Sequence, residues 1–180
     1  MDELKIRIKP ILKKAEKSRL PGRIDRDYPS KVLAVFIREA VLNKLRKFAS
    51  SDLHFELGGV LVGRVGKASK RMFVEITDYV PASKGISRRA SFEFTNEAQQ
   101  EIHQVIQERF KESRIVGWFH THPGYGIFLS SADQFIDDHY FKERYHIAMV
   151  LDPTRHDVEA GVFIWDKGKR TRVPWFEVKV

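Results

Sequence analysis

The pattern of apolar and polar positions predicts regular secondary structure from Val32 to the end of the chain. Short apolar runs indicate buried strands, and they occur at residues 32–37, 58–63, 73–80, 115–119, 147–151 and 161–165. Apolar side chains three or four residues apart indicate helices, here at 39–49, from Thr95/Asn96 to about Lys111, and from Ser130 onward. The resulting order β-α-β-β-α-β-α-β-β predicts an α/β fold, a sandwich of a mixed β-sheet with flanking helices.

Polar segments between these runs are expected to form the connections. The basic segment Arg64 to Arg71 is predicted to be the turn of a hairpin between the strands at 58–63 and 73–80. A second basic turn is expected at Lys167 to Arg172. The stretch Ser83–Ser91 is polar and is predicted to be a flexible loop.

The first 30 residues differ in composition from the rest. Through Arg26 they carry nine Lys and Arg against four acidic residues, and proline follows at positions 21 and 29. Such a segment is typical of a basic appendage with a linker, and a solvated tail without a specific task is the simpler interpretation of its role. We therefore expect two parts: a basic N-terminal extension and linker at 1–30 and one globular domain at 31–180.

Charge narrows the classes of partner only slightly. The chain has 32 Lys and Arg against 24 Asp and Glu, a net charge of +8 in 180 residues. An acidic partner is compatible with this excess, but net charge speaks to association and solubility and not to fold. Because much of the excess lies in the first 26 residues and in the predicted basic turns, we expect no specific binding of nucleic acid.

Two absences exclude further classes of protein. There is no cysteine, which excludes disulfides, thiol nucleophiles and zinc held by thiolates, so a metal would need histidine and carboxylate ligands. The first residues carry a charge every few positions, unlike a signal peptide, and no stretch approaches the roughly 20 apolar residues of a membrane span. We expect a soluble, cytoplasmic protein with no membrane association.

The segment that follows the strand at 115–119 carries a metal-ligand pattern. His120 and His122 are two residues apart at the end of a strand, so their side chains project from one face. Asp133, in the first turn of the next helix, is placed to supply an oxygen. Two histidines and one carboxylate, with the fourth position left to water, form the ligand set of a hydrolytic zinc site. Requiring Pro123, Ser130 and Asp133 at these spacings lowers the chance expectation to on the order of one in ten thousand.

A zinc-bound water also needs a proton carrier, and Glu56 is the candidate. It comes immediately before the strand at 58–63, where a buried carboxylate would be costly without a partner. The residues alone do not single it out, because it is one of 13 glutamates and a surface glutamate at a strand start is the simpler interpretation.

These segments resemble a known family. Glu56-Leu-Gly-Gly-Val-Leu-Val-Gly63, followed by Gly117-Trp-Phe-His-Thr-His-Pro and then Ser130 and Asp133, is similar to the JAMM (MPN-plus, JAB/MPN) zinc metalloproteases. The stretch from Gly124 to Ser130 is especially similar to the proteasome-lid deubiquitinase and to prokaryotic JAMM isopeptidases. The resemblance covers about residues 32–165 and implies the MPN sandwich, which is cytidine-deaminase-like.

The resemblance also implies a role for each residue of the motif. His120, His122 and Asp133 would bind one catalytic Zn²⁺, Glu56 would activate the zinc-bound water and return the proton to the leaving amine, and Ser130 would hydrogen-bond the oxyanion. The implied substrate is the isopeptide bond between the C-terminal tail of ubiquitin or a ubiquitin-like protein and a lysine. Association with a proteasome or an unfoldase is a further expectation.

The insertion at about Pro81 to Ala90 is implied to bind the extended tail of the substrate. Its Arg88 and Arg89 would steer an acidic partner, although a solvated loop is an equally good interpretation. Some eukaryotic members hold a second zinc with Cys and His, and a chain without cysteine cannot. This difference favours a simple prokaryotic ubiquitin-like partner over linkage-selective cleavage of polyubiquitin.

Alternatives remain open on the sequence alone. The chain could be an MPN-fold scaffold or interaction module without activity, or a zinc peptidase that processes a sulfur-carrier precursor or cell-wall peptides. His54, two residues before Glu56, is a minor candidate for a neighbour of the site, and His139 and His146 are expected to be surface or packed residues. Trp118 is expected either in the core or in the wall of the tail groove.

Overall fold

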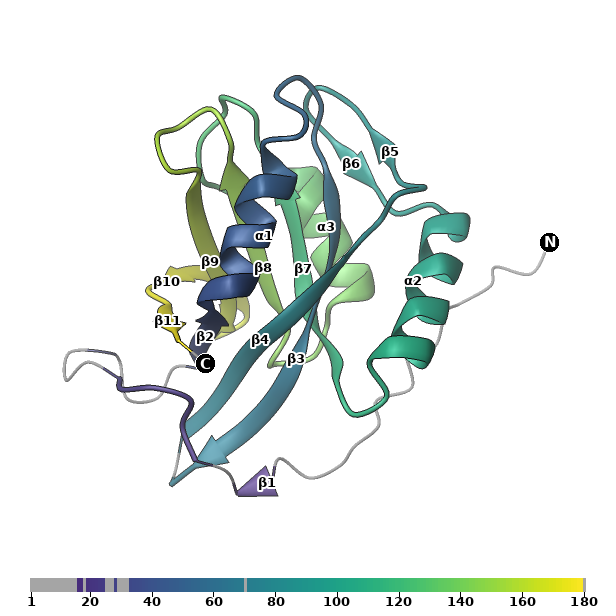
Figure 1. The fold of residues 1–180 in the computed structure, drawn as a ribbon. Coiled ribbons are helices and arrows are strands. Elements are labelled where there is room, and N and C mark those ends of the chain that lie inside the picture. The colour runs from purple at the N-terminus through teal and green to yellow at the C-terminus, as the bar shows by residue number, and fades with distance from the viewer. Residues whose placement is uncertain (1–15, 18, 25–27, 29–32, 70, 180) are drawn as a thin grey trace.

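The computed structural model describes residues 16–17, 19–24, 28, 33–69 and 71–179 and confirms the predicted α/β fold with a mixed sheet (Figure 1). Its elements in chain order are β1 (Glu16–Lys17), β2 (Ala34–Arg38), α1 (Glu39–Ala49), β3 (Gly58–Ala68), β4 (Arg71–Pro81), β5 (Ile86–Ser87), β6 (Phe92–Glu93), α2 (Asn96–Arg109), β7 (Arg114–Thr121), α3 (Ser131–Tyr140), β8 (Ile147–Asp152), β9 (Glu159–Asp166), β10 (Lys169–Val173) and β11 (Phe176–Val178).

The main sheet has the strand order β10-β9-β8-β7-β3-β4-β2-β11, and β1 pairs with β3 outside this path. The pairs β7–β8, β2–β4 and β2–β11 are parallel, whereas β3 is antiparallel to both β4 and β7. Strands β3, β7 and β8 therefore occupy the middle of the sheet, and their buried, β-branched side chains fit that position.

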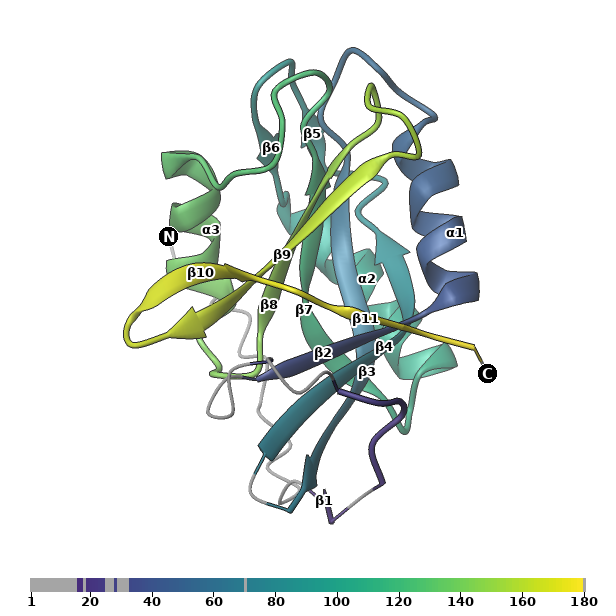
Figure 2. The ribbon, with the colours of Figure 1, turned by 90° about the vertical axis from the view of Figure 1, so that its left-hand side faces the viewer.

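Helices cover both faces of this sheet. Helix α1 lies on one face, and α2 and α3 lie on the other (Figures 1 and 2). Accordingly there is one apolar core on each side: one includes Leu42 and Leu45 of α1, and the other includes Ile102 of α2 and Ile136 of α3. No helix among the described residues is long and apolar enough to cross a membrane.

The helix starts follow local rules that the sequence shows. The Thr95 hydroxyl accepts a hydrogen bond from the amide of Ala98 at 3.0 Å and caps α2. Ser130 and Asp133 form a reciprocal capping box at the start of α3. The predicted helix starts at Thr95/Asn96 and Ser130 are thereby confirmed, while α2 ends at Arg109, slightly before the expected Lys111.

The predicted basic turn at Arg64 to Arg71 is wrong. Strand β3 continues through Ala68 and β4 begins at Arg71, so the hairpin is longer and its turn is tighter than expected. A register shift between Val62 and Gly63 explains the missed continuation, because the bulge interrupts the two-residue alternation.

The C-terminal part also differs from the expectation. The predicted basic turn at Lys167 to Arg172 shrinks to a tight turn around Gly168, and Lys169–Val173 forms β10 against β9. Strand β11 then returns to pair with β2. Strand β10 has three charged residues in five, and β11 has only three residues, so neither contains an apolar run. The predicted loop at Ser83–Ser91 likewise contains β5, which pairs with β6.

The described part of the N-terminal region packs onto the domain. Leu20 and Ile24 lie against a small core that contains Tyr28, Phe36 and Phe73. The Tyr28 hydroxyl donates a hydrogen bond to the carbonyl of Leu33 at 2.7 Å. The residues at 1–15 lie outside the described part, and the division at residue 30 stays a prediction.

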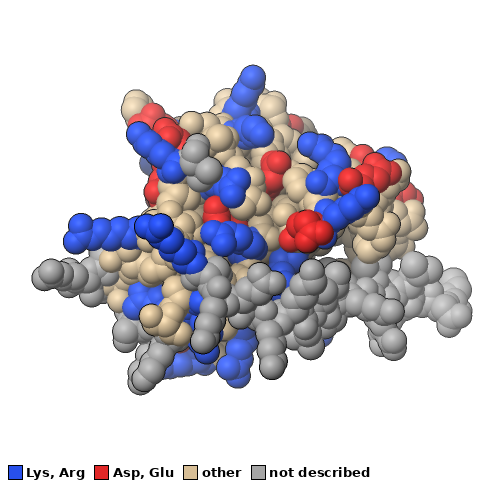
Figure 3. Space-filling view, turned by 60° about the horizontal axis from the view of Figure 1, so that its bottom comes forward, with Lys and Arg blue, Asp and Glu red and all other residues tan. Residues whose placement is uncertain are grey.

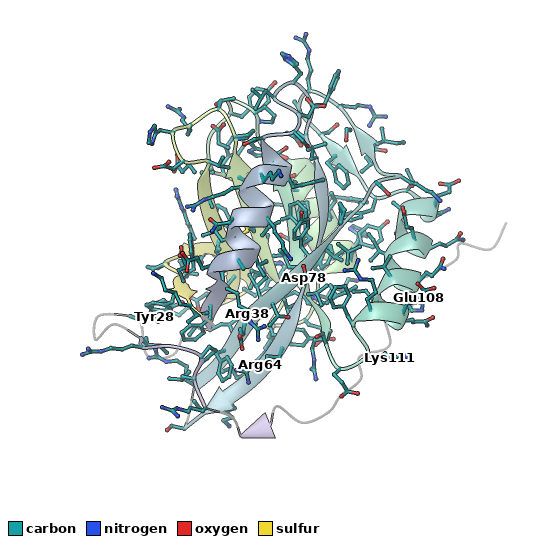
Figure 4. The ribbon with its side chains drawn as sticks, viewed as in Figure 1. Tyr28, Arg38, Arg64, Asp78, Glu108 and Lys111 are labelled. Atoms are coloured by element: carbon teal, nitrogen blue, oxygen red, sulfur yellow. The ribbon has the colours of Figure 1, made fainter. Side chains whose placement is uncertain are left out.

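Basic side chains gather at the end of the molecule that carries the β3–β4 turn. Lys and Arg predominate over Asp and Glu on this face (Figure 3). Arg38 and Arg64 lie close together there (Figure 4) and both bind the buried carboxylate of Glu75, Arg38 at 2.9 Å. This basic face lies at the other end of β3 from Gly58, the residue that pairs with His120.

Candidate metal centre

Strand β7 carries the two histidines into the middle of the sheet. His120 lies opposite Gly58 of β3 and Val150 of β8, and the amide of His122 donates to the carbonyl of Leu151 at 2.8 Å just beyond the strand end. Both rings are buried, and their Nε2 atoms are 2.9 Å apart. The expectation that both imidazoles share one face is confirmed by this convergence.

Helix α3 supplies the carboxylate. Asp133 Oδ1 lies 3.2 Å from His120 Nε2, and its Oδ2 lies 3.5 Å from His122 Nε2. Oδ2 also accepts a hydrogen bond of 2.6 Å from the amide of Ser130 as part of the capping box. The start of α3 therefore fixes the carboxylate in place before any ligand arrives.

These three side chains fit a zinc ion. Among the described residues, His120, His122 and Asp133 form a buried group whose ligand atoms are mutually close enough for one metal. Ligands about 2.0–2.1 Å from a tetrahedral zinc lie roughly 3.3 Å from one another. The distances of 2.9, 3.2 and 3.5 Å among Nε2 and Oδ atoms require adjustments of a few tenths of an ångström at most.

Glu56 faces the same group from the segment that precedes β3. Its Oε1 lies 3.7 Å from His122 Nε2, the side chain is buried, and Oε2 has no hydrogen-bond partner among the described residues. Burial raises the pKa of Glu56 to about 7. A buried oxygen without a partner is costly unless something fills the space beside it, and a water held between Glu56 and the metal would do so.

Backbone hydrogen bonds hold the Glu56 segment on two sides. The amide of Glu56 donates to the carbonyl of Arg88 in the insertion at 2.8 Å. The next residue, Leu57, donates from its amide to the Thr121 hydroxyl and accepts from the Thr121 amide, both at 2.8 Å. Glu56 is therefore positioned between the insertion and the residue that separates the two histidines.

The pKa shifts of His120 and Asp133 favour metal binding, whereas that of His122 opposes it. Burial lowers the pKa of His120, so its ring is neutral. Burial would raise the pKa of Asp133, but hydrogen bonds with His120 and His122 outweigh this and hold it well below its usual range. Burial alone would lower the pKa of His122, yet Asp133 and Glu56 together raise it. A neutral imidazole beside an ionised carboxylate is the form that binds zinc.

Aromatic side chains form a rim beside the histidines. Phe128 lies 4.7 Å from the His122 ring and Tyr125 lies 6.3 Å from it, both as centroid distances. Both are about half exposed, as are Phe55 beside Glu56 and Ile86 of β5 in the insertion. Exposed apolar side chains next to a buried polar group are typical of a ligand-binding surface.

Other residues singled out by the sequence lie elsewhere. His54 and His139 are exposed, and His146 is buried, with its Nδ1 accepting from the amide of Glu143. Arg88 and Arg89 are both exposed, and Arg88 forms an ion pair with Glu93. Trp118 is fully buried, so the interpretation of this residue as part of the core is the correct one.

Sequence reasoning missed the residues that support the site from behind. Asp137, one helical turn after Asp133, is buried and accepts hydrogen bonds from Trp118 and from Arg170 of β10. The four-residue spacing of the two aspartates places them on one face of α3 and was a usable signal. For Arg170 the sequence held no such signal, since this residue lies in a basic segment predicted to be a turn.

Comparison with known proteins assigns the family. Residues 30–144, more than half of the chain, match the family model described as JAB1/Mov34/MPN/PAD-1 ubiquitin protease. The chain belongs to this family, and the resemblance stated from the motif is confirmed.

Individual relatives agree with this assignment. The chain is 29% identical over 151 residues to COP9 signalosome complex subunit 5 of Yarrowia lipolytica, covering 79% of this chain and 40% of that protein. It is 25% identical over 122 residues to 26S proteasome regulatory subunit RPN11 of Eremothecium gossypii, covering 66% and 38%. It is 25% identical over 99 residues to ubiquitin carboxyl-terminal hydrolase RPN11 of Saccharomyces cerevisiae, covering 55% and 31%. The chain thus spans 40% or less of these relatives.

A solved structure supports the fold alone. The solution structure of a protein from Desulfitobacterium hafniense superposes with a TM-score of 0.60 at 15% identity, covering 81% of this chain and 92% of that one. The similarity extends over most of both chains and therefore supports the described α/β sandwich as the fold.

Proposed function

We propose that this protein is a zinc-dependent isopeptidase that removes ubiquitin or a ubiquitin-like protein from its conjugates. The observation that carries the proposal is the buried carboxylate of Glu56 beside a His-His-Asp group that fits zinc. Its Oε1 lies 3.7 Å from His122 Nε2, and its Oε2 has no hydrogen-bond partner in the part of the chain that the structure describes. Two of the relatives named above are described as a ubiquitin hydrolase and a proteasome subunit, which supports this class of substrate.

The chain's own residues suit each step of amide hydrolysis. His120, His122 and Asp133 hold the metal, and when bound, Zn²⁺ lowers the pKa of its water toward about 7 and polarises the scissile carbonyl. Glu56, with its pKa near 7, accepts a proton on its carboxylate and passes it to the leaving amine of lysine. The balance is one water consumed, the C–N bond broken, and a carboxylic acid and an amine formed.

Ser130 stabilises the charge that develops on the carbonyl oxygen. Its Oγ accepts from the amide of Asp133 at 3.2 Å, so the hydroxyl proton remains available for donation. A donor of this kind, aimed at a developing oxyanion, contributes roughly 10²–10³-fold to turnover. The half-exposed aromatic side chains Tyr125 and Phe128 contact the apolar part of the substrate tail.

Cleavage assays with a base-deficient variant test the proposal. Wild type and Glu56→Gln are incubated with ubiquitin-like fusions and lysine conjugates, with zinc content measured on both. We expect cleavage by wild type and a loss of at least 100-fold in Glu56→Gln at equal zinc content. Zinc-loaded wild type that cleaves none of the conjugates would point to the scaffold. Glu56-dependent cleavage of only sulfur-carrier precursors or cell-wall peptides would assign the peptidase alternative.

A further inference from the structure

A tight turn follows the second histidine, and its conformation is unusual. Gly124 and Gly126 have φ values of +80° and +82°, in the left-handed region that favours glycine. Their positive φ values direct both backbone N–H groups toward β8. Glycine adopts this conformation readily, so the direction of the turn is set by the groups that bind these two amides.

The group that binds them is the carboxylate of Asp152, the last residue of β8. Its Oδ1 accepts from the amide of Gly124 and its Oδ2 from the amide of Gly126, both at 3.0 Å. Oδ1 also accepts from the amide and the hydroxyl of Thr154, at 3.0 and 2.7 Å. The residue is fully buried, so its hydrogen bonds are protected from competition with water.

The same turn fixes the direction and the tautomer of the His122 imidazole. The Nδ1 atom of His122 lies 3.1 Å from the carbonyl oxygen of Gly126. A carbonyl oxygen can only accept, so Nδ1 must carry the proton, and the lone pair of the neutral ring is then on Nε2. Nε2 is the atom that faces His120 and Asp133. Asp152 therefore holds Gly126 through its N–H group, and the carbonyl group of the same residue determines which nitrogen of His122 is free to bind metal.

We propose that Asp152 is a positioning residue of the metal centre, one that fixes the tautomer and ring direction of His122 through the turn at Gly124–Gly126. The inference rests on the proposed function only for the identity of the metal. It assigns a role to a residue that touches neither the metal ligands nor the carboxylate of Glu56.

The negative charge of Asp152 is needed for this role. Each oxygen serves a different glycine amide, and four donors converge on the carboxylate. Burial would raise the pKa of Asp152, but these hydrogen bonds outweigh it and keep the pKa low. An asparagine would offer one oxygen and one NH₂ group, and the NH₂ group would face one of the N–H donors. Asp152→Asn therefore loses part of the turn while nearly preserving side-chain volume.

The test compares Asp152→Asn with Glu75→Gln, in which another buried carboxylate is changed on β4, where it binds Arg38 and Arg64. Zinc affinity is measured by competition with a chelator, and the His122 tautomer by ¹⁵N NMR of the imidazole in metal-free protein. We expect Asp152→Asn to weaken zinc binding by about 10- to 100-fold and to lose the Nδ1-protonated tautomer. Glu75→Gln should retain wild-type affinity and tautomer whatever its stability.

A folded Asp152→Asn variant with wild-type affinity and an unchanged tautomer would overturn the proposal. If Asp152→Asn does not fold, Thr154→Val decides, since it removes only the hydroxyl hydrogen bond to Oδ1. That variant should bind zinc a few-fold more weakly, and unchanged binding would equally overturn the proposal. Neither readout uses a substrate, so a protein that binds zinc but cleaves nothing would contradict the isopeptidase function and leave the role of Asp152 intact.

Discussion

The indole ring of Trp118 lies nearly parallel to the imidazole of His120, with ring centroids 4.5 Å apart and planes 15° apart. The indole Nε1–H donates to Asp137 Oδ1 at 2.9 Å, and Arg170 Nε donates to the other oxygen of Asp137 at 2.9 Å. The ring plane of His120 is thus set by a buried chain of contacts that ends on β10. This chain is separate from the contacts that position His122.

Replacing Arg170, the cation in this series of buried contacts, should strongly destabilise the protein. Burial raises the pKa of Asp137, and Arg170 is the first of the groups that oppose this rise. Arg170→Met leaves a buried carboxylate without its counter-charge, which typically costs about 3–5 kcal/mol. We expect a loss of that order in the free energy of unfolding, measured by urea denaturation.

The double variant Arg170→Met/Asp137→Asn provides the control for the Arg170 prediction. It has no buried charge and keeps an oxygen that can accept from Trp118, so it should be more stable than Arg170→Met alone. A double variant that is as unstable as the sum of the two single variants would show that Asp137 and Arg170 are not energetically coupled.

Ser130→Gly should separate the structural from the catalytic role of the hydroxyl. Glycine at a helix N-cap costs only a few tenths of a kcal/mol relative to serine, so the melting temperature should change little. Turnover of a ubiquitin-like conjugate should fall by about 100-fold or more, because the donor to the oxyanion is lost. Ser130→Thr, which keeps the hydroxyl, is the matched control, and equal turnover in Ser130→Gly and wild type would remove Ser130 from the mechanism.

Zinc should stabilise the folded protein measurably. At a free concentration of 1,000 times Kd, a ligand of the folded state adds about 4 kcal/mol, which corresponds to roughly 10 °C in the melting temperature of a domain of this size. Calorimetry with and without a chelator measures the shift. Mg²⁺, which prefers six oxygen ligands, should not reproduce it, and His122→Ala should abolish it. A full shift in His122→Ala would place the zinc elsewhere.

His146 should make stability depend on pH. Burial and the charge of Arg170 lower its pKa to about 4 in the folded protein, against about 6.5 in the unfolded chain. Between these values the unfolded chain binds a proton that the folded one does not, so stability is lost as the pH falls. Between pH 7.5 and 5, wild type should lose about 2 kcal/mol more than His146→Gln in urea denaturation.

The comparison with His146→Gln is necessary because Glu56 acts in the opposite direction in metal-free protein. Its raised pKa of about 7 means that the folded state binds a proton first, so stability increases as the pH falls toward the ordinary value for glutamate. This contribution of Glu56 to the pH dependence of stability is the same in wild type and in His146→Gln, so it cancels when the two proteins are compared. Parallel pH profiles for wild type and His146→Gln would contradict the prediction.

The parts of the fold that the sequence predicted are those with a strong local signal. Strand β8 is a continuous apolar run, and α2 and α3 begin at Thr95 and Ser130, residues that cap helices through their own side chains. Strands β10 and β11 have no comparable signal. Their stability comes from pairing, β10 with the adjacent β9 and β11 with β2, which lies far away in the sequence.

The residues of the site also differ in how far the sequence could predict them. The positions of His120, His122 and Asp133 follow from strand alternation and a helix start, so their spacing alone was informative. Glu56 is separated from His120 by 64 residues and became a candidate only through a family resemblance. Asp152 binds a backbone amide and Arg170 binds the buried carboxylate of Asp137, and neither contact follows from the spacing of residues in the sequence. Only the three-dimensional structure relates these two residues to the histidines.

Strand β3 joins the two ends of the molecule. It begins at Gly58, opposite His120, and ends at Ala68 in the basic hairpin, and eleven strand residues at about 3.3 Å each span roughly 35 Å. A molecule held at the hairpin turn would therefore not cover the side chains that face the metal position at the other end of the strand.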